Sequence, residues 1–187
     1  IHGLVRDERG EKYSKTRGNV VDPLDLIDRF GADALRFTLA ALTMPGSDLK
    51  LSESRTEGYR HFANKIWNAS RFALMNLEKF NVNEVTQETL PEEFSLPDRW
   101  IRGRLNQVIR EVQKSLENYK FNEASHTLYQ FIWHEFCDWY LELTKLYLYK
   151  EEGKKRQSLT QQTLLEVLDA ILRLLHPFMP FITEEIW

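Results

Sequence analysis

The sequence predicts a mainly α-helical protein: an antiparallel bundle of four helices, preceded by a small α/β module that carries a lysine-rich loop. From residue 54 onward, apolar residues recur at the helical spacing of about 3.6 residues over four long segments. Before residue 52, short apolar runs alternate with glycine, proline and charged residues, which is typical of short strands and loops. We therefore divide the chain into residues 1–51 and 52–187, and expect the helical part to fold independently.

The amino-terminal module is expected to contain two strands and two short helices. Its apolar runs at 1–5 and 48–51 indicate the strands. Asp22 before Pro23 is a helix N-cap followed by proline in the first turn, so a helix begins there, and Gly31 ends it. The second helix follows at once and is broken by the next proline-glycine pair.

Capping patterns predict where the four bundle helices begin. The expected starts are the capping boxes at 54–57 and 158–161, the Pro97-Asp98 pair and an N-cap at Asn122. The helices are expected to end near residues 77, 116, 149 and 177. The third is rich in aromatic residues, and its Trp133 and Trp139 are expected to lie in the core or at its rim.

The composition limits the classes of protein to which this chain can belong. With 187 residues and 42% hydrophobic content, it is long enough to bury a core. Its apolar runs are short and interrupted by charge, which excludes a membrane span and a signal peptide. The single cysteine, Cys137, excludes a disulfide framework and a cysteine zinc site, and fits a reducing cytoplasm. The net charge of −3 means that any contact with RNA must come from local patches.

No metal site is expected from the sequence. The histidines are scattered, without the spacing of a ligand pair, at positions 2, 61, 126, 134 and 176. The acidic residues are spread along helix faces and form no convincing acid–base pair. We therefore expect each histidine to have a structural role.

The loop from Gly10 to Pro23 is the stretch best suited to binding a polyphosphate. Lys12 and Lys15 can place ammonium groups on phosphate oxygens, and the Ser14 hydroxyl adds a neutral donor. The glycines at both ends allow a close backbone approach. Taken alone, the same residues also fit a solvated basic turn, because runs of charge lie mostly on protein surfaces.

The sequence around this loop resembles a known signature. Residues 12–16, Lys-Tyr-Ser-Lys-Thr, resemble the lysine–serine loop of the class I aminoacyl-tRNA synthetases, and residues 17–23 and 31–37 resemble the segments that follow it. The pattern of that family is Lys-Met-Ser-Lys-Ser. Tyr13 and Thr16 therefore depart from it, while both lysines and the serine between them remain.

This resemblance implies roles for single residues. It implies that Lys12, Ser14 and Lys15 are the catalytic and ATP-binding residues, with Lys15 foremost. The loop would close over ATP, used with magnesium, and stabilise charge as an amino-acid carboxylate attacks the α-phosphate. Asn19 and Asp22 are expected to shape the loop and cap the helix rather than touch substrate.

Further motifs resemble the valine-specific members of this family. They are residues 46–51, 58–60, 64–72 and 136–143, while 176–187 is shared with the isoleucine and leucine enzymes. The resemblance covers nearly the whole chain. It implies the carboxy-terminal part of a cytoplasmic, monomeric ligase that activates valine with ATP and transfers it to its tRNA. Residues 1–51 would end the catalytic domain, and 52–187 would be the helical anticodon-binding domain.

This chain alone is expected to be inactive, because the other half of the active site, a His-Ile-Gly-His motif, would precede Ile1. Two alternatives stay open at this point. One is an isoleucine-specific or other related class I synthetase. The other is a helical protein-interaction module with an incidental lysine loop, and binding of an isolated tRNA anticodon stem-loop would separate it from a synthetase.

The first bundle helix offers a candidate surface for RNA. At about 100° per residue, its apolar stripe centres near Tyr59, and Asn64, Asn68, Arg71 and Phe72 lie on the opposite side. An exposed phenylalanine beside arginine and asparagine can stack on unpaired bases and bind their edges. We therefore predict that these four residues contact the anticodon stem-loop of the tRNA. The alternative is that Phe72 is buried, because a bundle helix with two neighbours buries two faces.

Overall fold

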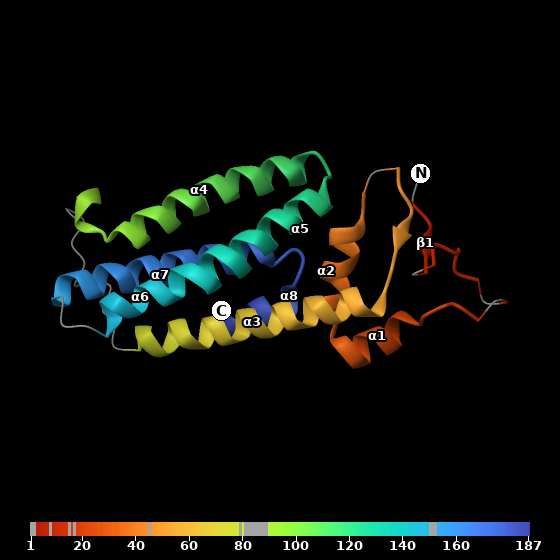
Figure 1. Cartoon of the computed structure of the whole chain (residues 1–187), viewed down its shortest axis with the longest axis horizontal. Helices are drawn as coiled ribbons and strands as arrows, with labels where there is room; N and C mark the ends of the chain where they lie inside the picture. Colours follow the sequence, from red (N-terminus) through yellow and green to blue (C-terminus); the bar gives the residue numbers. More distant parts are fainter. Residues whose placement is uncertain are drawn as a thin grey trace.

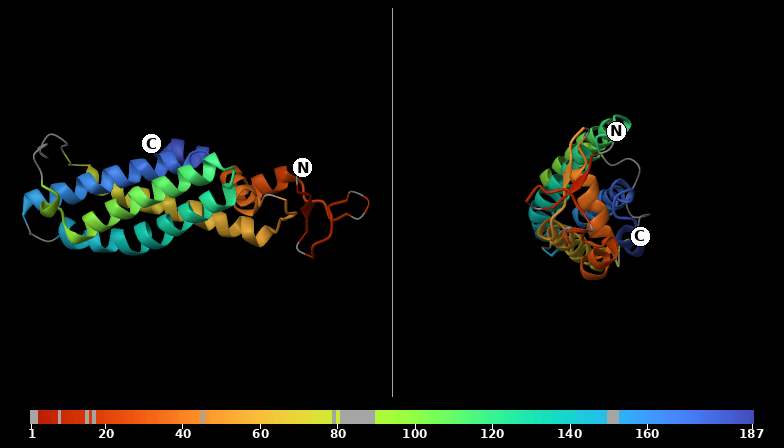
Figure 2. Two further views of the ribbon diagram at one scale, coloured as in Figure 1. Left: turned by 90° about the horizontal axis from the view of Figure 1, so that it is seen from above. Right: turned by 90° about the vertical axis from the view of Figure 1, so that its right-hand side faces the viewer.

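The computed structural model describes residues 3–7, 9–14, 16, 18–44, 46–78, 80, 90–149 and 153–187. The molecule is elongated, with the long helices grouped around one axis and the amino-terminal module at one end (Figures 1 and 2). This arrangement agrees with the predicted fold class, a helical bundle after a small α/β module. None of the helices in these residues is both long and apolar enough to cross a membrane.

The amino-terminal module pairs two very short strands. Strand β1 (Val5–Arg6) lies parallel to β2 (Leu49–Lys50), with Val5 opposite Leu49. Helices α1 (Pro23–Phe30) and α2 (Ala32–Leu42) lie between them in the chain and are separated by Gly31, whose φ of 90° is accessible to glycine at little cost. Buried Leu26, Leu35 and Leu51 form a small core for this module.

Eight elements form the rest of the described chain. They are α3 (Glu53–Leu77), the 3-10 turn η3 (Pro91–Glu93), α4 (Leu96–Glu117), α5 (Phe121–Gln130), η4 (Phe131–Tyr140), α6 (Leu141–Leu148), α7 (Lys154–Leu175) and α8 (Pro180–Ile186), of which α5, η4 and α6 form one continuous helix. Its middle part, η4, has the wider turns of a π-helix.

The predicted helix starts are wrong by two to five residues. Helix α3 is capped by Ser52, whose hydroxyl accepts a hydrogen bond from the Arg55 N–H at 3.3 Å, instead of by Ser54. Helix α7 begins right after Gly153, because four good helix formers extend it before the predicted start at residue 158. Several residues near each start can cap a helix, so packing decides which of them does.

The other two starts differ for a similar reason. Helix α4 is capped by Ser95, whose hydroxyl accepts a hydrogen bond from the Asp98 N–H at 3.2 Å, so Pro97 and Asp98 lie inside its first turn. Helix α5 follows a tight turn in which Tyr119 has a left-handed φ of 56°. That turn places Lys120 at the helix start, and the predicted cap at Asn122 is therefore wrong.

Consecutive bundle helices alternate in direction, but they are not all neighbours. Phe62 and Phe72 of α3 contact Tyr129 and Lys145, so α3 lies beside the long α5–η4–α6 helix and parallel to it (Figure 1). Helix α4 likewise lies parallel to α7, where the Asp98 carboxylate accepts a hydrogen bond from Thr160 at 2.9 Å. Helices α3 and α4 therefore both pack against the long helix and α7, and they lie at opposite corners of the bundle.

A buried carboxylate ties three of these helices together. Asp98 of α4 is fully buried and accepts hydrogen bonds from Tyr140 of η4 at 2.8 Å, from Thr160 of α7, and from Ser95 at 2.6 Å. A buried carboxylate is tolerated only when its oxygens have such partners. This network therefore fixes how α4, η4 and α7 pack against one another.

Helix α2 belongs to the bundle core as much as to the module. Its Phe37 is fully buried, and its ring centre lies 4.8 Å from that of Tyr59, 5.3 Å from Phe62 and 6.1 Å from Phe178. In Figure 1, α2 lies across the end of the bundle, between the bundle and the β1–β2 pair. A division of the chain after residue 51 would therefore cut through a shared core.

The two tryptophans of the third bundle helix have different environments. Trp133 is half-buried and stacks on Tyr129, with ring centres 5.5 Å apart. Trp139 is 64% exposed, so its predicted place in or at the core is wrong. The wider turns of η4 bring Phe136 and Tyr140 to the core and turn Trp139 towards solvent.

Candidate functional site

The lysine loop is shaped by one asparagine. The Asn19 amide oxygen accepts a hydrogen bond from the Ser14 N–H at 2.9 Å, while its nitrogen donates to the Lys12 carbonyl at 3.3 Å. The same nitrogen donates to the Asp7 carboxylate at 3.0 Å. Asn19 therefore joins both sides of the loop, which confirms the predicted structural role, as does the hydrogen bond from the Leu24 N–H to the capping carboxylate of Asp22.

Asp7 completes this arrangement from the strand side. Its other carboxylate oxygen accepts hydrogen bonds from the backbone N–H groups of Arg9, at 3.0 Å, and Glu11, at 2.8 Å. The side chain of Asn19, followed by these backbone donors, lowers the pKa of Asp7 below its usual value. The loop is thus held by an ionised carboxylate at its base.

Two of the three predicted catalytic residues lie in the described part of the loop. The Lys12 backbone pairs with Arg6, and its side chain is exposed to solvent. The Ser14 hydroxyl lies 2.8 Å from that of Thr16. The third residue, Lys15, lies outside the described residues.

Tyr13 anchors the loop to the small core of the module. Its N–H donates to the Val5 carbonyl at 3.2 Å, and its half-buried side chain packs against the cluster of Leu26, Leu35 and Leu51. The aromatic ring at this position therefore contributes to packing. A hollow of about 280 Å³ beside it is lined by Asp7 and Glu53, whose carboxylates make it unsuited to phosphate.

Three of the four predicted RNA-binding residues lie on the outer face of α3. Asn64, Asn68 and Arg71 are exposed. Phe72 is half-buried against the bundle core, and the Lys145 ammonium lies 5.7 Å from its ring centre. Its predicted position on the open face is therefore wrong, because α3 packs between α7 and the long helix and buries a flank there.

The outer face of α3 also contains residues that the sequence pattern did not single out. At about 100° per residue, the buried residues of α3 centre roughly 20° around the helix axis from the predicted stripe. Leu74, predicted to be buried, is consequently 49% exposed, and Trp67 is exposed between Asn64 and Arg71. Its helical spacing from those two residues is the signal that could have identified Trp67.

Asn64 also lies at the edge of a hollow between α1, α2, α3 and α8. This hollow, of about 490 Å³, is lined by Arg29 and Arg60 and by Phe181, which is largely exposed. The Arg29 guanidinium donates to both carboxylate oxygens of Glu53, at 2.8 and 2.7 Å, so much of its charge is neutralised. Arg60 is then the main cation that this hollow offers to a ligand.

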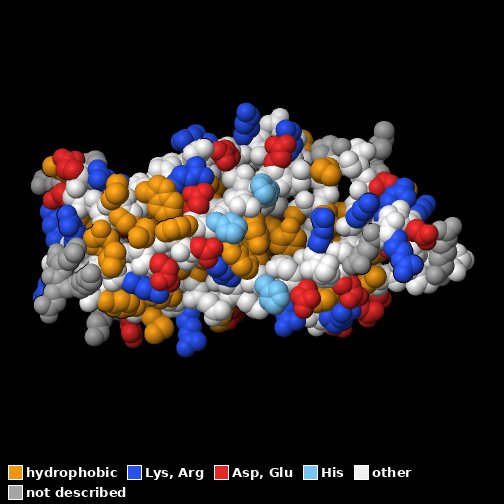
Figure 3. All heavy atoms as spheres, viewed as in Figure 1, with side chains coloured by type: hydrophobic (Ala, Val, Ile, Leu, Met, Phe, Trp, Pro, Cys, Tyr) orange, Lys and Arg blue, Asp and Glu red, His pale blue; other side chains and the backbone are white. Residues whose placement is uncertain are grey.

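The surface has no broad area of one charge on the face drawn in Figure 3. Lysine, arginine and acidic side chains are interspersed there, and hydrophobic side chains gather over the half of the bundle far from the module. Among the described residues, no group of three or more histidine, cysteine or acidic side chains is arranged to hold a metal ion. Recognition of a polyanion on this molecule would therefore depend on a few local cations.

Comparisons with known proteins give one consistent result. Residues 1–52 match the family model of tRNA synthetases class I (I, L, M and V), and residues 98–187 match that of the anticodon-binding domain of tRNA ligase. The whole chain is 57% identical over 187 residues to a valine–tRNA ligase of Geobacter sulfurreducens, of which it covers 21%. It thus spans about a fifth of the length of that relative.

Two solved structures share the fold. One is the ternary complex of Agrobacterium radiobacter K84 agnB2 LeuRS with tRNA and LeuAMS, with a TM-score of 0.71 and 28% identity, covering 100% of this chain and 22% of that chain. The other is Mycobacterium tuberculosis methionyl-tRNA synthetase in complex with methionyl-adenylate, with a TM-score of 0.79 and 22% identity, covering 100% of this chain and 36% of that chain.

Proposed function

The chain belongs to the class I tRNA synthetases, and on this premise we propose that it is the ATP-loop and anticodon-binding part of a valine–tRNA ligase. The observation that carries this proposal is the fixed attachment of a lysine–serine loop, through Tyr13 and Asn19, to one end of a helical bundle. The full protein would activate valine with ATP and transfer it to its tRNA. We include in the proposal that it acts as a monomer in the cytoplasm.

The loop residues suit the activation step. When bound, ATP supplies the α-phosphate that a valine carboxylate attacks. Lys12 presents an exposed ammonium group, Ser14 and Thr16 present hydroxyls, and Lys15 adds a second cation from the same loop. These groups fit phosphate oxygens and would stabilise the charge that develops as pyrophosphate leaves. Asp7, at the base of the loop, is engaged by Asn19 and backbone donors, so magnesium would be held mainly by the phosphates and not by this carboxylate.

Substitution of Lys15 tests the catalytic role of the loop. In the full-length enzyme, Lys15→Ala should lower valine-dependent ATP–pyrophosphate exchange far more than it weakens tRNA binding, because the charge acts chiefly in the transition state. Lys154→Ala removes an exposed lysine at the start of α7 and serves as the matched control. Equal losses of exchange and of tRNA affinity in Lys15→Ala would contradict this role.

The outer face of α3 is the proposed contact with the anticodon stem-loop. Arg71 supplies a cation, Asn64 and Asn68 supply amide donors and acceptors, and Trp67 supplies an aromatic face for stacking. Phe72 would contribute from the flank of this face, where its ring is partly covered. This combination is suited to unpaired bases of RNA.

Binding of an isolated anticodon stem-loop to the chain tests this surface. Arg71→Ala should weaken binding several-fold, while Arg173→Ala, an exposed arginine on α7, should leave binding unchanged. If Arg71 contacts phosphate, its loss should flatten the salt dependence; if it contacts a base, its loss should relax base preference. Absence of stem-loop binding by the wild-type chain would contradict the anticodon-binding function and favour a helical protein-interaction module.

A further inference from the structure

Helix α2 binds the turn between α7 and α8 with a carboxylate. Asp33, 8% exposed, accepts hydrogen bonds from the N–H groups of Phe181, at 3.2 Å, and Ile182, at 2.7 Å. Each of its two oxygens therefore caps one of the otherwise unpaired amides in the first turn of α8. The contact joins residues that are 148 and 149 positions apart in the chain.

An arginine one turn later binds the other side of the same turn. The Arg36 guanidinium donates to the carbonyl oxygens of Pro177, at 3.0 Å, and Phe178, at 3.3 Å. The Phe178 ring meets Phe37 edge-on, with ring centres 6.1 Å apart. Asp33 and Arg36 thus bind backbone groups on both sides of the turn and fix its position relative to α2.

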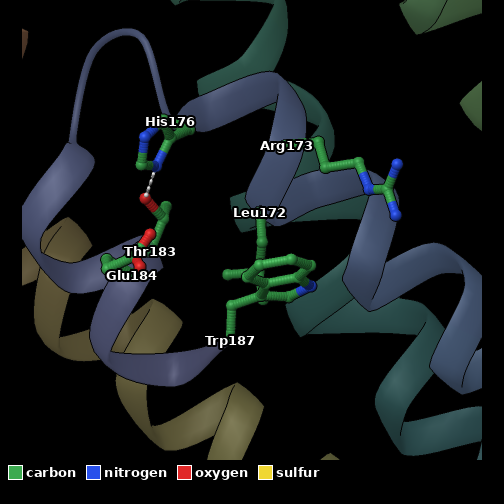
Figure 4. Close-up of a pocket in the computed structure, with 6 residues that line it drawn as sticks. All are labelled: Leu172, Arg173, His176, Thr183, Glu184 and Trp187. Atoms are coloured by element: carbon green, nitrogen blue, oxygen red, sulfur yellow. Dashed lines mark hydrogen bonds between the residues drawn. The ribbon is translucent and has the colours of Figure 1, made fainter.

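The turn is itself held together by side chains. The Thr183 hydroxyl lies 2.8 Å from the Met179 carbonyl oxygen and 2.8 Å from Nδ1 of His176 (Figure 4). Trp187, which lines the hollow drawn in Figure 4 together with Leu172, donates from its Nε1–H to the Asp169 carboxylate of α7 at 3.2 Å. Because these contacts tie α8 to the end of α7, a displacement of α7 would move the whole turn.

The opposite side of α2 reaches the lysine loop. Leu35 lies in the small core with Leu26 and Leu51, and Tyr13 of the loop packs on that core. Two residues of one helix, Asp33 and Arg36, therefore contact the bundle, while a residue between them contacts the support of the loop. A helix packed into both cores is a physical connection through which a movement of one core can reach the other.

We propose that Asp33 and Arg36 are positioning residues that couple RNA binding by the bundle to the placement of the lysine loop. This coupling rests on the proposed function, because it requires a tRNA on the bundle and ATP at the loop. Its consequence is that a correct anticodon raises the rate of aminoacylation through α2. By linkage, a nucleotide at the loop changes the affinity of the bundle for the stem-loop by the same factor.

The test compares anticodon discrimination in the full-length enzyme. Discrimination is the ratio of kcat/KM for valine tRNA to that for the same tRNA with a changed anticodon. Asp33→Asn keeps the shape of the side chain, but its amide nitrogen cannot accept a hydrogen bond from the α8 backbone. Discrimination should therefore fall at least about five-fold, which is the lower end of the typical range for coupling between two binding sites. Arg36→Gln should act in the same direction, and exchange activity without tRNA should change less than about two-fold.

A matched control separates coupling from loss of stability. Ile101→Val removes one methyl group from the bundle core, far from α2, and should lower the melting temperature without changing discrimination. If Asp33→Asn and Arg36→Gln lower the melting temperature but keep discrimination, the contacts are purely structural and the coupling is refuted. If the wild-type enzyme shows no discrimination at all, the proposed function fails instead.

Hydrogen exchange on the wild-type enzyme tests the coupling without any substitution. Hydrogen exchange of residues 10–23 should change when the anticodon stem-loop binds, because those amides include the Tyr13 N–H and Ser14 N–H bonds of the loop. An RNA with a changed anticodon should have a smaller effect at equal occupancy. Stem-loop binding with unchanged loop exchange would overturn the coupling and leave anticodon binding intact.

Discussion

Replacement of Phe37 by alanine should destabilise the helical bundle, although Phe37 precedes the predicted domain boundary. The side chain is fully buried among Tyr59, Phe62 and Phe178. Truncation of a buried phenylalanine costs about 3–5 kcal/mol. Since three ring contacts are lost together, and each is worth about 0.5–1.5 kcal/mol beyond its buried area, we expect the upper part of that range.

Loss of the whole module should have a still larger effect. A chain that begins at Ser52 lacks Phe37 and also the bonds of Asp33 and Arg36 to the α7–α8 turn. Domains are stable by only about 5–15 kcal/mol, so these losses are a large part of the total. We therefore expect the 52–187 chain to lack a stable fold at ordinary temperature and to show no cooperative unfolding transition. This differs from the independent folding predicted from the sequence.

Urea unfolding followed by circular dichroism measures both effects. Leu39→Ala, at a partly exposed position on the same helix, is the matched control and should cost much less than Phe37→Ala. A cost for Phe37→Ala no greater than that of the control would refute the shared core. So would a 52–187 chain that unfolds cooperatively at the same urea concentration as the full chain.

Three further outcomes are expected. Tyr140→Phe removes the donor to the Asp98 carboxylate in the buried network, and should lower the free energy of unfolding by about 1.5–3 kcal/mol in urea titration. The Leu4 N–H, followed by the Arg6 side chain, lowers the pKa of Asp48 in the folded protein. The ionised carboxylate therefore stabilises the β1–β2 pair at pH values above the pKa of Asp48 in the unfolded chain. This stabilisation is lost as the pH falls through the lowered pKa of the folded protein. Hydrogen exchange of the β2 amides, corrected for intrinsic rate, should therefore rise in acid below about pH 4, and Asp48→Asn should remove this dependence. Trp139→Ala should change the melting temperature little because the side chain is largely exposed, and a large loss would show that it packs.

The reactivity of Cys137 depends on one fact from the sequence and one from the structure. The sequence shows one cysteine, and the structure shows that it is buried, which raises its pKa to about 12. The thiol therefore stays protonated and unreactive, as expected of a small apolar residue in a core. The number of cysteines could be read from the sequence, but the burial of Cys137 depends on the packing of η4.

Local information explains which parts of the site could be predicted. Asp22 caps α1, and Asn19 bridges Lys12 and Ser14, because these residues are within a few positions of their partners. Exposure on a helix surface is different, since it depends on how many neighbours the helix has. Phe72 became half-buried because α3 has a neighbour on that flank.

By itself the sequence determined the helical class, the capped helix after the lysine loop and the residues of the loop, because each depends on contacts within one or two turns of chain. Only the tertiary structure decided that α3 and α4 lie at opposite corners, that Phe37 belongs to the bundle core, and that Asp33 and Arg36 bind a turn more than 140 residues away. The physical reason is that such contacts arise when separate segments dock, and docking depends on the shapes of whole surfaces, which no local spacing encodes.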